Sequence, residues 1–152
     1  MDRTRPTLNQ LNIVSSNLDS SIAFYRRLGI DIPDQRVWRT ATGAHHASAK
    51  DDASGIDLDL DLDGTRFVQV WNAGWRGRED LAGRAVVGSG PTSRAEVDRL
   101  HGEMTAAGYR GLQAPHDAFW GARYAVIEDP DGMAVGLMSP ISDAHRSPPP
   151  EV

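Results

Sequence analysis

The feature that most constrains the fold of this chain is an internal duplication. The segment HHASAKDDASGIDLDL overlays on ARYAVIEDPDGMAVGL when Gly55 is placed on Gly132, a shift of 77 residues (132 − 55). Upstream, Ile22 falls on Val97 with a shift of 75 residues (97 − 22), so the offsets differ only by a short loop. Self-similarity at a fixed offset indicates a repeated structural module. Because each half reads as a strand, a helix and three strands, the sequence predicts an α+β fold of two tandem βαβββ modules.

The first module, at about residues 8–64, contains one helix by its pattern of apolar residues. Asn17 or Asp19 is placed to cap this helix by accepting its free N–H groups, and Gly29 follows its last turn. The segment IDLDLDL alternates strictly between apolar and acidic residues, which is typical of a half-buried strand. The predicted strands of this module are 8–15, 36–40, 45–49 and 56–62.

The second module, at about residues 84–140, repeats this order after a strand at 84–89. Val97, Leu100 and Met104 recur at spacings of three and four residues, so they form the buried stripe of a helix. This helix is expected to end at Gly108 and to be followed by a short strand at 112–114. The strands ARYAVIED and MAVGLMS, joined by the turn PDG, then close the module as a hairpin.

Length and composition limit the classes of protein to which the chain can belong. Its 152 residues predict one domain over residues 1–141, and the net charge of −5 argues against a nucleic-acid partner. The absence of cysteine excludes disulfides, thiolate metal ligands and a cysteine nucleophile. No apolar run approaches the roughly 18 residues of a membrane span, and MDRTRPTLNQ lacks the apolar core of a signal peptide. We therefore expect a cytoplasmic protein with no membrane partner and a disordered, proline-rich tail over residues 142–152.

Two segments near the ends of the chain resemble a known superfamily. LNQLNIVSSNLDSSIAFYRRLGI, with its strand, short turn and aromatic pair before Leu-Gly, resembles the opening strand and helix of vicinal oxygen chelate proteins. WGARYAVIEDPDGMAVGL resembles their closing hairpin. This superfamily includes glyoxalases, bleomycin resistance proteins and extradiol dioxygenases, and the resemblance covers residues of about 8–140. It implies that the strands form a curled mixed sheet around a cleft and that the protein is a homodimer.

The resemblance also implies where a metal ion would be held. Metal-dependent members bind a divalent ion through His, Gln and Glu side chains on the first and last strands of the modules. The corresponding positions are Gln10, Asp59, a place near residues 84–87 that offers no ligand, and Gly136, which has no side chain. Since such sites generally need about three protein ligands, Gln10 and Asp59 alone would not suffice. The departure points to the metal-free branch, with no cofactor, which includes the antibiotic-binding resistance proteins.

The chain has four tryptophans, and three of them are candidates for ligand contact. Trp71 and Trp75 flank the segment that links the modules, and Trp120 precedes the closing hairpin. Indole faces suit flat or cationic ligands through stacking and cation–π attraction, although Trp71 and Trp75 could instead form dimer contacts. Trp38 is expected to fill the core.

Three polar side chains are further candidates. His45 and His46 are neighbours on a predicted strand and face opposite ways, so we expect one to face solvent and one, His46, to line the cleft. His116 is expected in a loop, where ligand contacts are common. Arg123 begins the closing strand and can reach either a ligand or an aspartate.

A row of aspartates lies on one face of the last strand of the first module. Asp57, Asp59 and Asp61 alternate there with leucines, which should face the helix. The aspartates form either a solvated edge or an acidic patch for a cationic or hydroxyl-rich ligand.

These observations favour a metal-free small-molecule binding protein of the bleomycin-resistance type that encloses an aromatic or cationic ligand. The cleft would be completed by a second copy of the chain. The alternatives are a glyoxalase-type lyase or isomerase, or a dioxygenase, that uses a metal, and an enzyme with Asp59 or His46 as a metal-free general base. The predicted ligand contacts are Asp59, Trp71, Trp75, His116, Trp120, Arg123 and His46.

Overall fold

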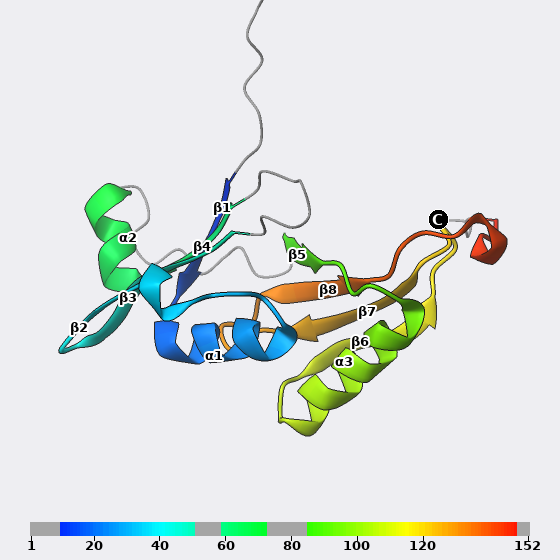
Figure 1. Ribbon diagram of the computed structural model, residues 1–152, viewed down its shortest axis with the longest axis horizontal. Helices are drawn as coiled ribbons and strands as arrows, with labels where there is room; N and C mark the ends of the chain where they lie inside the picture. Colours follow the sequence, from blue (N-terminus) through cyan, green and yellow to red (C-terminus); the bar gives the residue numbers. More distant parts are fainter. Residues whose placement is uncertain (1–9, 51–58, 73–84, 149–152) are drawn as a thin grey trace, which may run out of the picture. The chain divides into compact units, whose positions relative to one another are not determined.

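The computed structural model describes residues 10–50, 59–72 and 85–148, which fall into two compact units that divide between residues 78 and 79. Each unit contains a four-stranded mixed sheet (Figure 1). The two sheets confirm the predicted α+β class with two tandem βαβββ modules. No helix in these three ranges is long and apolar enough to cross a membrane.

In the first unit, β1 and β4 pair in parallel at the start of the strand order β1-β4-β3-β2, and the remaining pairs are antiparallel. Its elements are β1 (Gln10–Ser15), α1 (Leu18–Leu28), the 3-10 turn η1 (Asp34–Arg36), β2 (Val37–Thr40), β3 (Gly43–Lys50), β4 (Asp59–Gly64) and α2 (Thr65–Trp71).

The second unit has the same topology, with the strand order β5-β8-β7-β6 and a parallel pair of β5 and β8. Its elements are β5 (Val86–Ser89), α3 (Arg94–Ala106), β6 (Gly111–Asp117), β7 (Arg123–Glu128), β8 (Ala134–Met138) and the 3-10 turn η2 (Asp143–His145).

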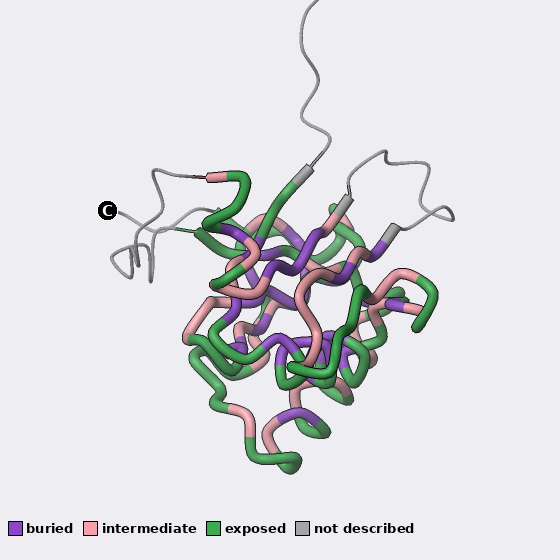
Figure 2. The backbone as a smooth tube through the Cα atoms, turned by 90° about the vertical axis from the view of Figure 1, so that its left-hand side faces the viewer, coloured by how far each residue is buried: buried purple, intermediate pink, exposed green. Residues whose placement is uncertain are grey.

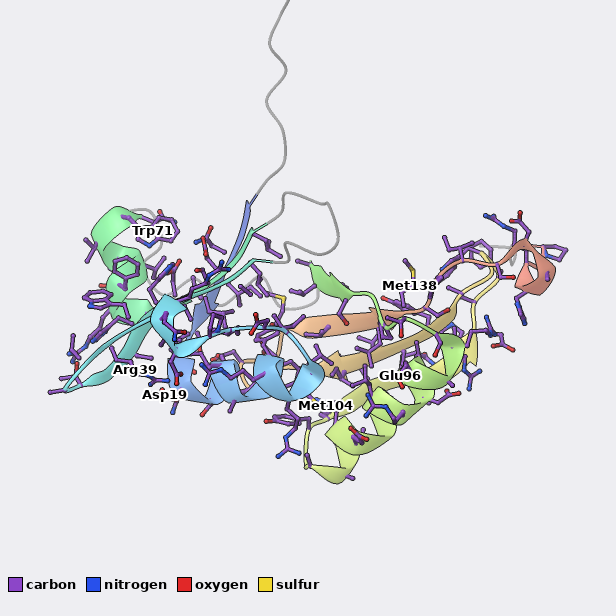
Figure 3. The ribbon with its side chains drawn as sticks, in the orientation of Figure 1. Asp19, Arg39, Trp71, Glu96, Met104 and Met138 are labelled. Atoms are coloured by element: carbon purple, nitrogen blue, oxygen red, sulfur yellow. The ribbon has the colours of Figure 1, made fainter. Side chains whose placement is uncertain are left out.

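The predicted helix α1 begins and ends at specific capping residues. Of the two candidates, Asn17 is the N-cap, and its side chain accepts a hydrogen bond from the backbone N–H of Ser20 at 3.1 Å. At the other end, Gly29 adopts a φ of 100°, a conformation that costs a glycine little, and its N–H bonds to the last carbonyls. The other candidate, Asp19, pairs with Arg39 instead, as Figure 3 shows.

The core of the first unit lies between α1 and the face of the sheet formed by β3 and β4 (Figure 1). Phe24 and Tyr25 are fully buried on α1, with ring centroids 4.9 Å apart in an edge-to-face arrangement. On the strands, Ala47 and Leu62 are buried toward them. The alternate residues of β3 and β4 therefore project to the opposite face, which α2 partly covers.

The core of the second unit is the predicted stripe of α3 packed on β7 and β8. Val97 and Met104 are fully buried, as expected, while Leu100 is half-buried. They pack on one face of the sheet, where Ile127, Val135 and Leu137 are fully buried. The buried positions are purple in Figure 2, and the exposed turns and helix faces are green.

Trp38 is not a core residue, contrary to the expectation. It lies on β2, the edge strand, and half of its side chain is exposed. An edge strand has a neighbour on one side only, and here it is just four residues long. Trp38 instead packs edge-on against Phe67 of α2, with ring centroids 5.3 Å apart.

Two other expectations about local structure are wrong. The segment that follows β4, expected as a linker around Trp71, begins with α2, a helix that ends at Trp71 itself. His116 lies not in a loop but on β6, which extends three residues beyond the predicted 112–114 and pairs His116 with Tyr124 of β7.

Residues 142–148 differ from the disordered tail that their composition predicts. The N–H of Ser142 donates to the carbonyl of Gly121, and the N–H of Ser147 to the carbonyl of Phe119, both at 3.0 Å. Gly121 has a φ of 97°, and a Cβ there would collide with the Ser142 carbonyl oxygen, so a glycine is what allows the tail to approach. Backbone hydrogen bonds of this kind leave no signal in composition. Residues 149–152 lie outside the described part.

Candidate functional site

The candidate site is a pocket on the face of the first sheet opposite α1. Its volume is about 260 Å³. It combines carboxylate, imidazole, amide and aromatic side chains from strands β1, β3 and β4 and from helix α2. The lining residues are Asn12, His46, Asp61, Asp63, Phe67 and Trp71.

Strand register brings the polar residues of the pocket together. In the parallel pair of β1 and β4, Asn12 lies opposite Asp61. In the antiparallel pair of β3 and β4, His46 lies opposite Asp63. Since residues two apart on a strand share a face, Asp61 and Asp63 point to the same side, while Leu62 between them is buried on the α1 side.

Helix α2 supplies the aromatic wall. Val68 is fully buried and anchors the helix to the sheet, although no side chain caps its N-terminus. Phe67 presents its ring edge-on to His46, with centroids 5.6 Å apart. Trp71 follows one turn later, at the end of the helix (Figure 3), and half of its side chain remains exposed. An indole in this position can cover a ligand that sits on the polar floor.

The floor of the pocket is acidic. Asp63 is 1% exposed, and its two oxygens accept hydrogen bonds from Nδ1 of His46 at 2.6 Å and Nδ2 of Asn12 at 2.8 Å. Asp61 is 6% exposed on the same face. Among the described residues that line the pocket, Asp61 and Asp63 supply two carboxylates, and a buried carboxylate is stabilised by positive charge or hydrogen-bond donors beside it. The arrangement favours a ligand that brings positive charge or hydrogen-bond donors.

Several predicted contacts fall at this pocket. His46 and Trp71 line it, and His45 faces away from it, with Nε2 bonded to the Thr40 hydroxyl at 2.6 Å. Of the aspartate row, Asp61 lies in the pocket rather than at a solvated edge. Asp57 and Trp75 lie outside the described residues.

Sequence reasoning missed Asn12, Asp63 and Phe67. For Asp63 a signal was present, because the alternation of the aspartate row continues one step beyond the predicted strand end. For Phe67 there was none, since α2 itself was not predicted.

The remaining predicted contacts belong to the second unit. Tyr124 of β7 is the centre of an aromatic cluster there, with its ring 5.5 Å from that of Trp120 and 6.1 Å from that of His116. Phe119 packs edge-on against Trp120 at 5.2 Å. A single cleft that joins these residues to Trp71 remains a prediction.

Arg123 is engaged by two aspartates of its own unit. Its Nε donates to Asp98 at 2.9 Å and its Nη1 to Asp117 at 3.2 Å. The hydrogen bond to Asp98 raises the pKa of Arg123 above its ordinary value, which fixes the positive charge on the guanidinium. The ion pairs give Arg123 a structural role in addition to any ligand contact.

The superfamily resemblance implies metal positions at Gln10, Asp59 and Gly136. Gln10 and Asp59 are register partners on β1 and β4, so their backbones are adjacent. In the second unit the partner of Gly136 is Gly88, which also lacks a side chain. A Cβ built at Gly136 would lie 2.7 Å from the Tyr124 hydroxyl oxygen, so the tyrosine occupies the space of a ligand side chain. Among the side chains described, no three His, Cys, Asp or Glu residues are grouped to hold a metal ion.

Comparison with known proteins identifies the fold independently. A family model described as the Glyoxalase/Bleomycin resistance protein/Dioxygenase superfamily matches residues 7–137. No curated protein matches the sequence.

Three similar solved structures carry glyoxalase-related descriptions. A glyoxalase/bleomycin resistance protein/dioxygenase family enzyme from Burkholderia phytofirmans PsJN is 15% identical with a TM-score of 0.71, covering 88% of this chain and 98% of that one. A glyoxalase-related enzyme from Fulvimarina pelagi is 18% identical with a TM-score of 0.69, covering 90% and 93%. A glyoxalase/bleomycin resistance protein/dioxygenase from Nocardioides is 22% identical with a TM-score of 0.66, covering 98% and 91%. At these identities the likeness establishes the fold alone.

Proposed function

Because the chain belongs to the glyoxalase/bleomycin resistance protein/dioxygenase superfamily, we propose that it is a metal-free small-molecule binding protein of this superfamily. Its ligand is a small, flat molecule with positive charge. The ligand binds with its charge on Asp61 and Asp63 and its flat face against Trp71 and Phe67.

The observation that carries this proposal is the pairing of buried carboxylates with an aromatic wall in one pocket. Asp61 and Asp63 are almost fully buried on one face of β4, and Phe67 and Trp71 of α2 stand beside them in the lining. A cation on the indole face of Trp71 gains cation–π attraction and approaches both carboxylates. A neutral ligand of the same shape gains only the stacking, so the pocket discriminates by charge.

The metal-free part of the proposal is supported by Gly136 and Tyr124. A side chain at Gly136 would overlap the Tyr124 hydroxyl group, so this strand offers no ligand to an ion. Metal content is the direct test. Elemental analysis of the purified protein is expected to give far less than one zinc, iron or manganese per chain, and one equivalent would favour a metal-dependent lyase or dioxygenase instead.

Binding can be tested with N-methylquinolinium, a flat aromatic cation, and with quinoline near pH 8 as the neutral molecule of the same shape. The cation is expected to quench tryptophan fluorescence and to bind more tightly than quinoline. Trp71→Ala removes the stacking surface and should weaken binding roughly 2- to 30-fold, the equivalent of about 0.5–2 kcal/mol. Asp61→Asn keeps the shape but removes the charge and should weaken binding of the cation roughly tenfold while leaving quinoline unaffected.

Matched controls separate the pocket from the rest of the chain. Asp34→Asn removes an exposed carboxylate of the same unit that pairs with Arg26 outside the pocket, and it should leave binding unchanged. Equal binding of cation and quinoline, together with unchanged binding by Trp71→Ala and Asp61→Asn, would contradict the proposal. Trp120→Ala tests the wider cleft, because it weakens binding only if both units contribute to one site.

The proposal also includes a cytoplasmic homodimer in which a second copy completes the cleft. Light scattering on the purified chain is expected to give twice the mass of one chain. If the chain is a monomer and still binds the cation, a second copy is not needed to complete the site, and this part of the proposal is wrong.

A further inference from the structure

We propose that the pocket catalyses metal-free proton abstraction from a flat carbon acid, with His46 as the general base and Asp63 as the residue that positions it. This inference rests on the proposed binding pocket and adds a reaction to it. The substrate class is a small aromatic or conjugated molecule with an activated C–H bond.

The geometry around His46 defines which of its ring nitrogens can act. A carboxylate can only accept hydrogen bonds, so Nδ1 of His46 donates to Oδ1 of Asp63 across their 2.6 Å contact. In the neutral imidazole this leaves Nε2 with a free lone pair. Within the described part of the chain, Nε2 of His46 makes no hydrogen bond. Nε2 of His46 is therefore available to accept a proton from a molecule in the pocket, which the side chain lines with 31% of its surface exposed.

Asp63, the hydrogen-bond partner of His46, is held rigidly in the sheet. It is 1% exposed, it lies on a strand paired on both sides, and its second oxygen accepts from Asn12 at 2.8 Å. A buried carboxylate bonded to the far nitrogen of an imidazole fixes its tautomer and stabilises the imidazolium that forms when a proton is taken. The Phe67 ring, 5.6 Å away, limits the orientations open to the imidazole.

The aromatic wall suggests how a substrate would be presented. A flat molecule stacked on Trp71 and Phe67 places its edge toward the polar floor, where His46 lies. The C–H bond at that edge breaks, its proton passes to Nε2, and the electron pair stays on the substrate. The proton leaves His46 to water, or returns to another atom of the substrate, so the step needs no oxidant or second reactant.

A reaction that requires only a base provides the probe. In 5-nitrobenzisoxazole, removal of the C3 proton forms the nitrile as the N–O bond breaks, and the oxygen keeps the electron pair as a coloured phenolate. The molecule is flat and bicyclic, which suits stacking on Trp71 and Phe67, and it is neutral, so it tests the base rather than the recognition of charge. We expect the protein to accelerate its ring opening above the buffer rate.

Three variants test the roles of the residues. His46→Gln should lower kcat roughly tenfold or more, because general-base catalysis typically contributes at least that much. Asp63→Asn should lower kcat with little change in KM, a split that a purely structural role would not produce. His45→Gln is the matched control on the adjacent residue outside the pocket, and it should leave the rate unchanged.

The outcomes separate this inference from the proposed function. If N-methylquinolinium binds but ring opening is no faster than in buffer, or is equally fast in His46→Gln, the inference is wrong and the binding function stands. If the cation does not bind, the binding function fails whatever the rate. If His46→Gln does not fold, inhibition of the wild-type reaction by N-methylquinolinium is the deciding measurement. Inhibition at concentrations near the binding constant of the cation supports catalysis in this pocket, and a lack of inhibition overturns the inference.

Discussion

Gly136→Ala is the substitution whose effect follows most directly from the structure. Gly136 lies on β8 between Val135 and Leu137, which are both fully buried toward α3. A Cβ at this position would lie 2.7 Å from the Tyr124 hydroxyl oxygen and 3.2 Å from two of its ring carbons. Such contacts are too short to persist, so Tyr124 must move. Its ring packs against Trp120, and a shift disturbs that contact as well.

The magnitude follows from three effects. Inserting a methyl group into a packed site costs about 1–3 kcal/mol. A weakened aromatic contact adds up to about 1 kcal/mol. Alanine in a strand recovers about 0.5–1 kcal/mol relative to glycine, because the unfolded chain loses less freedom on folding. We therefore expect Gly136→Ala to lower the free energy of unfolding by about 1–2 kcal/mol.

Urea unfolding followed by circular dichroism measures this change, and the structure supplies its control. Gly88 is the register partner of Gly136 on β5, and a Cβ there meets no atom within 4 Å. Gly88→Ala should therefore be neutral or slightly stabilising. In a Tyr124→Leu background the penalty at Gly136 should largely disappear. Equal stability of Gly136→Ala and Gly88→Ala would refute the reasoning, and with it the idea that Tyr124 closes this position.

Three further predictions concern stability. Asn12→Leu removes a donor to the buried Asp63 and should lower the free energy of unfolding by about 1–3 kcal/mol in a denaturant titration. Ser93→Ala removes the N-cap bond of α3 and should lower it by about 1 kcal/mol, with a lower melting temperature as the readout. Asp19 has a pKa below its ordinary value because Arg39 donates a hydrogen bond to it, so this pair stabilises the fold above the unfolded pKa and loses its effect as pH falls through the lowered one. Since both side chains are about half exposed, Asp19→Asn should cost at most about 1 kcal/mol at pH 7 and nothing in strong acid, as measured by melting at both pH values.

The sequence predicted the topology because its signals are local. The alternation through Leu60, Asp61 and Leu62, the cap at Asn17, which was one of two candidates, and the glycine at 29 each act within a few residues, and each appears in the described part of the structure. The repeat then gave the second unit the same strand order.

The features that the sequence did not reveal depend on tertiary contacts. Helix α2 has no side-chain cap and contains two β-branched valines, so its propensity is weak, and the burial of Val68 on the sheet stabilises it. Trp38 is a large apolar residue of the kind that usually fills a core, but its place on an edge strand leaves half of its side chain exposed. In both cases the neighbouring element decides the outcome.

For the candidate site, the sequence could place residues on a common face but not say what covers that face. The alternation predicted that Asp61 lies on the face of the strand opposite the leucines. The same pattern is expected for a solvated edge and for an acidic patch, so it could not distinguish the two. The difference comes from α2, which partly covers the face with Phe67 and Trp71. The partner of His46 was also hidden, because only the antiparallel register of β3 and β4 brings Asp63 opposite it.

The two units have one topology, but their equivalent strands carry different chemistry. β4 presents Asp61 and Asp63 on the face away from its covering helix α1, whereas β8 presents Gly136 and Met138 on the face away from α3. Under the proposed function, a cation is expected to gain more from the first sheet than from the second, whose aromatic cluster around Tyr124 offers stacking without a carboxylate on β8. It follows that the charge of a ligand should determine which substitutions affect its binding. Asp61→Asn acts only on cations, while substitutions near Tyr124 act on flat ligands regardless of charge if that surface takes part.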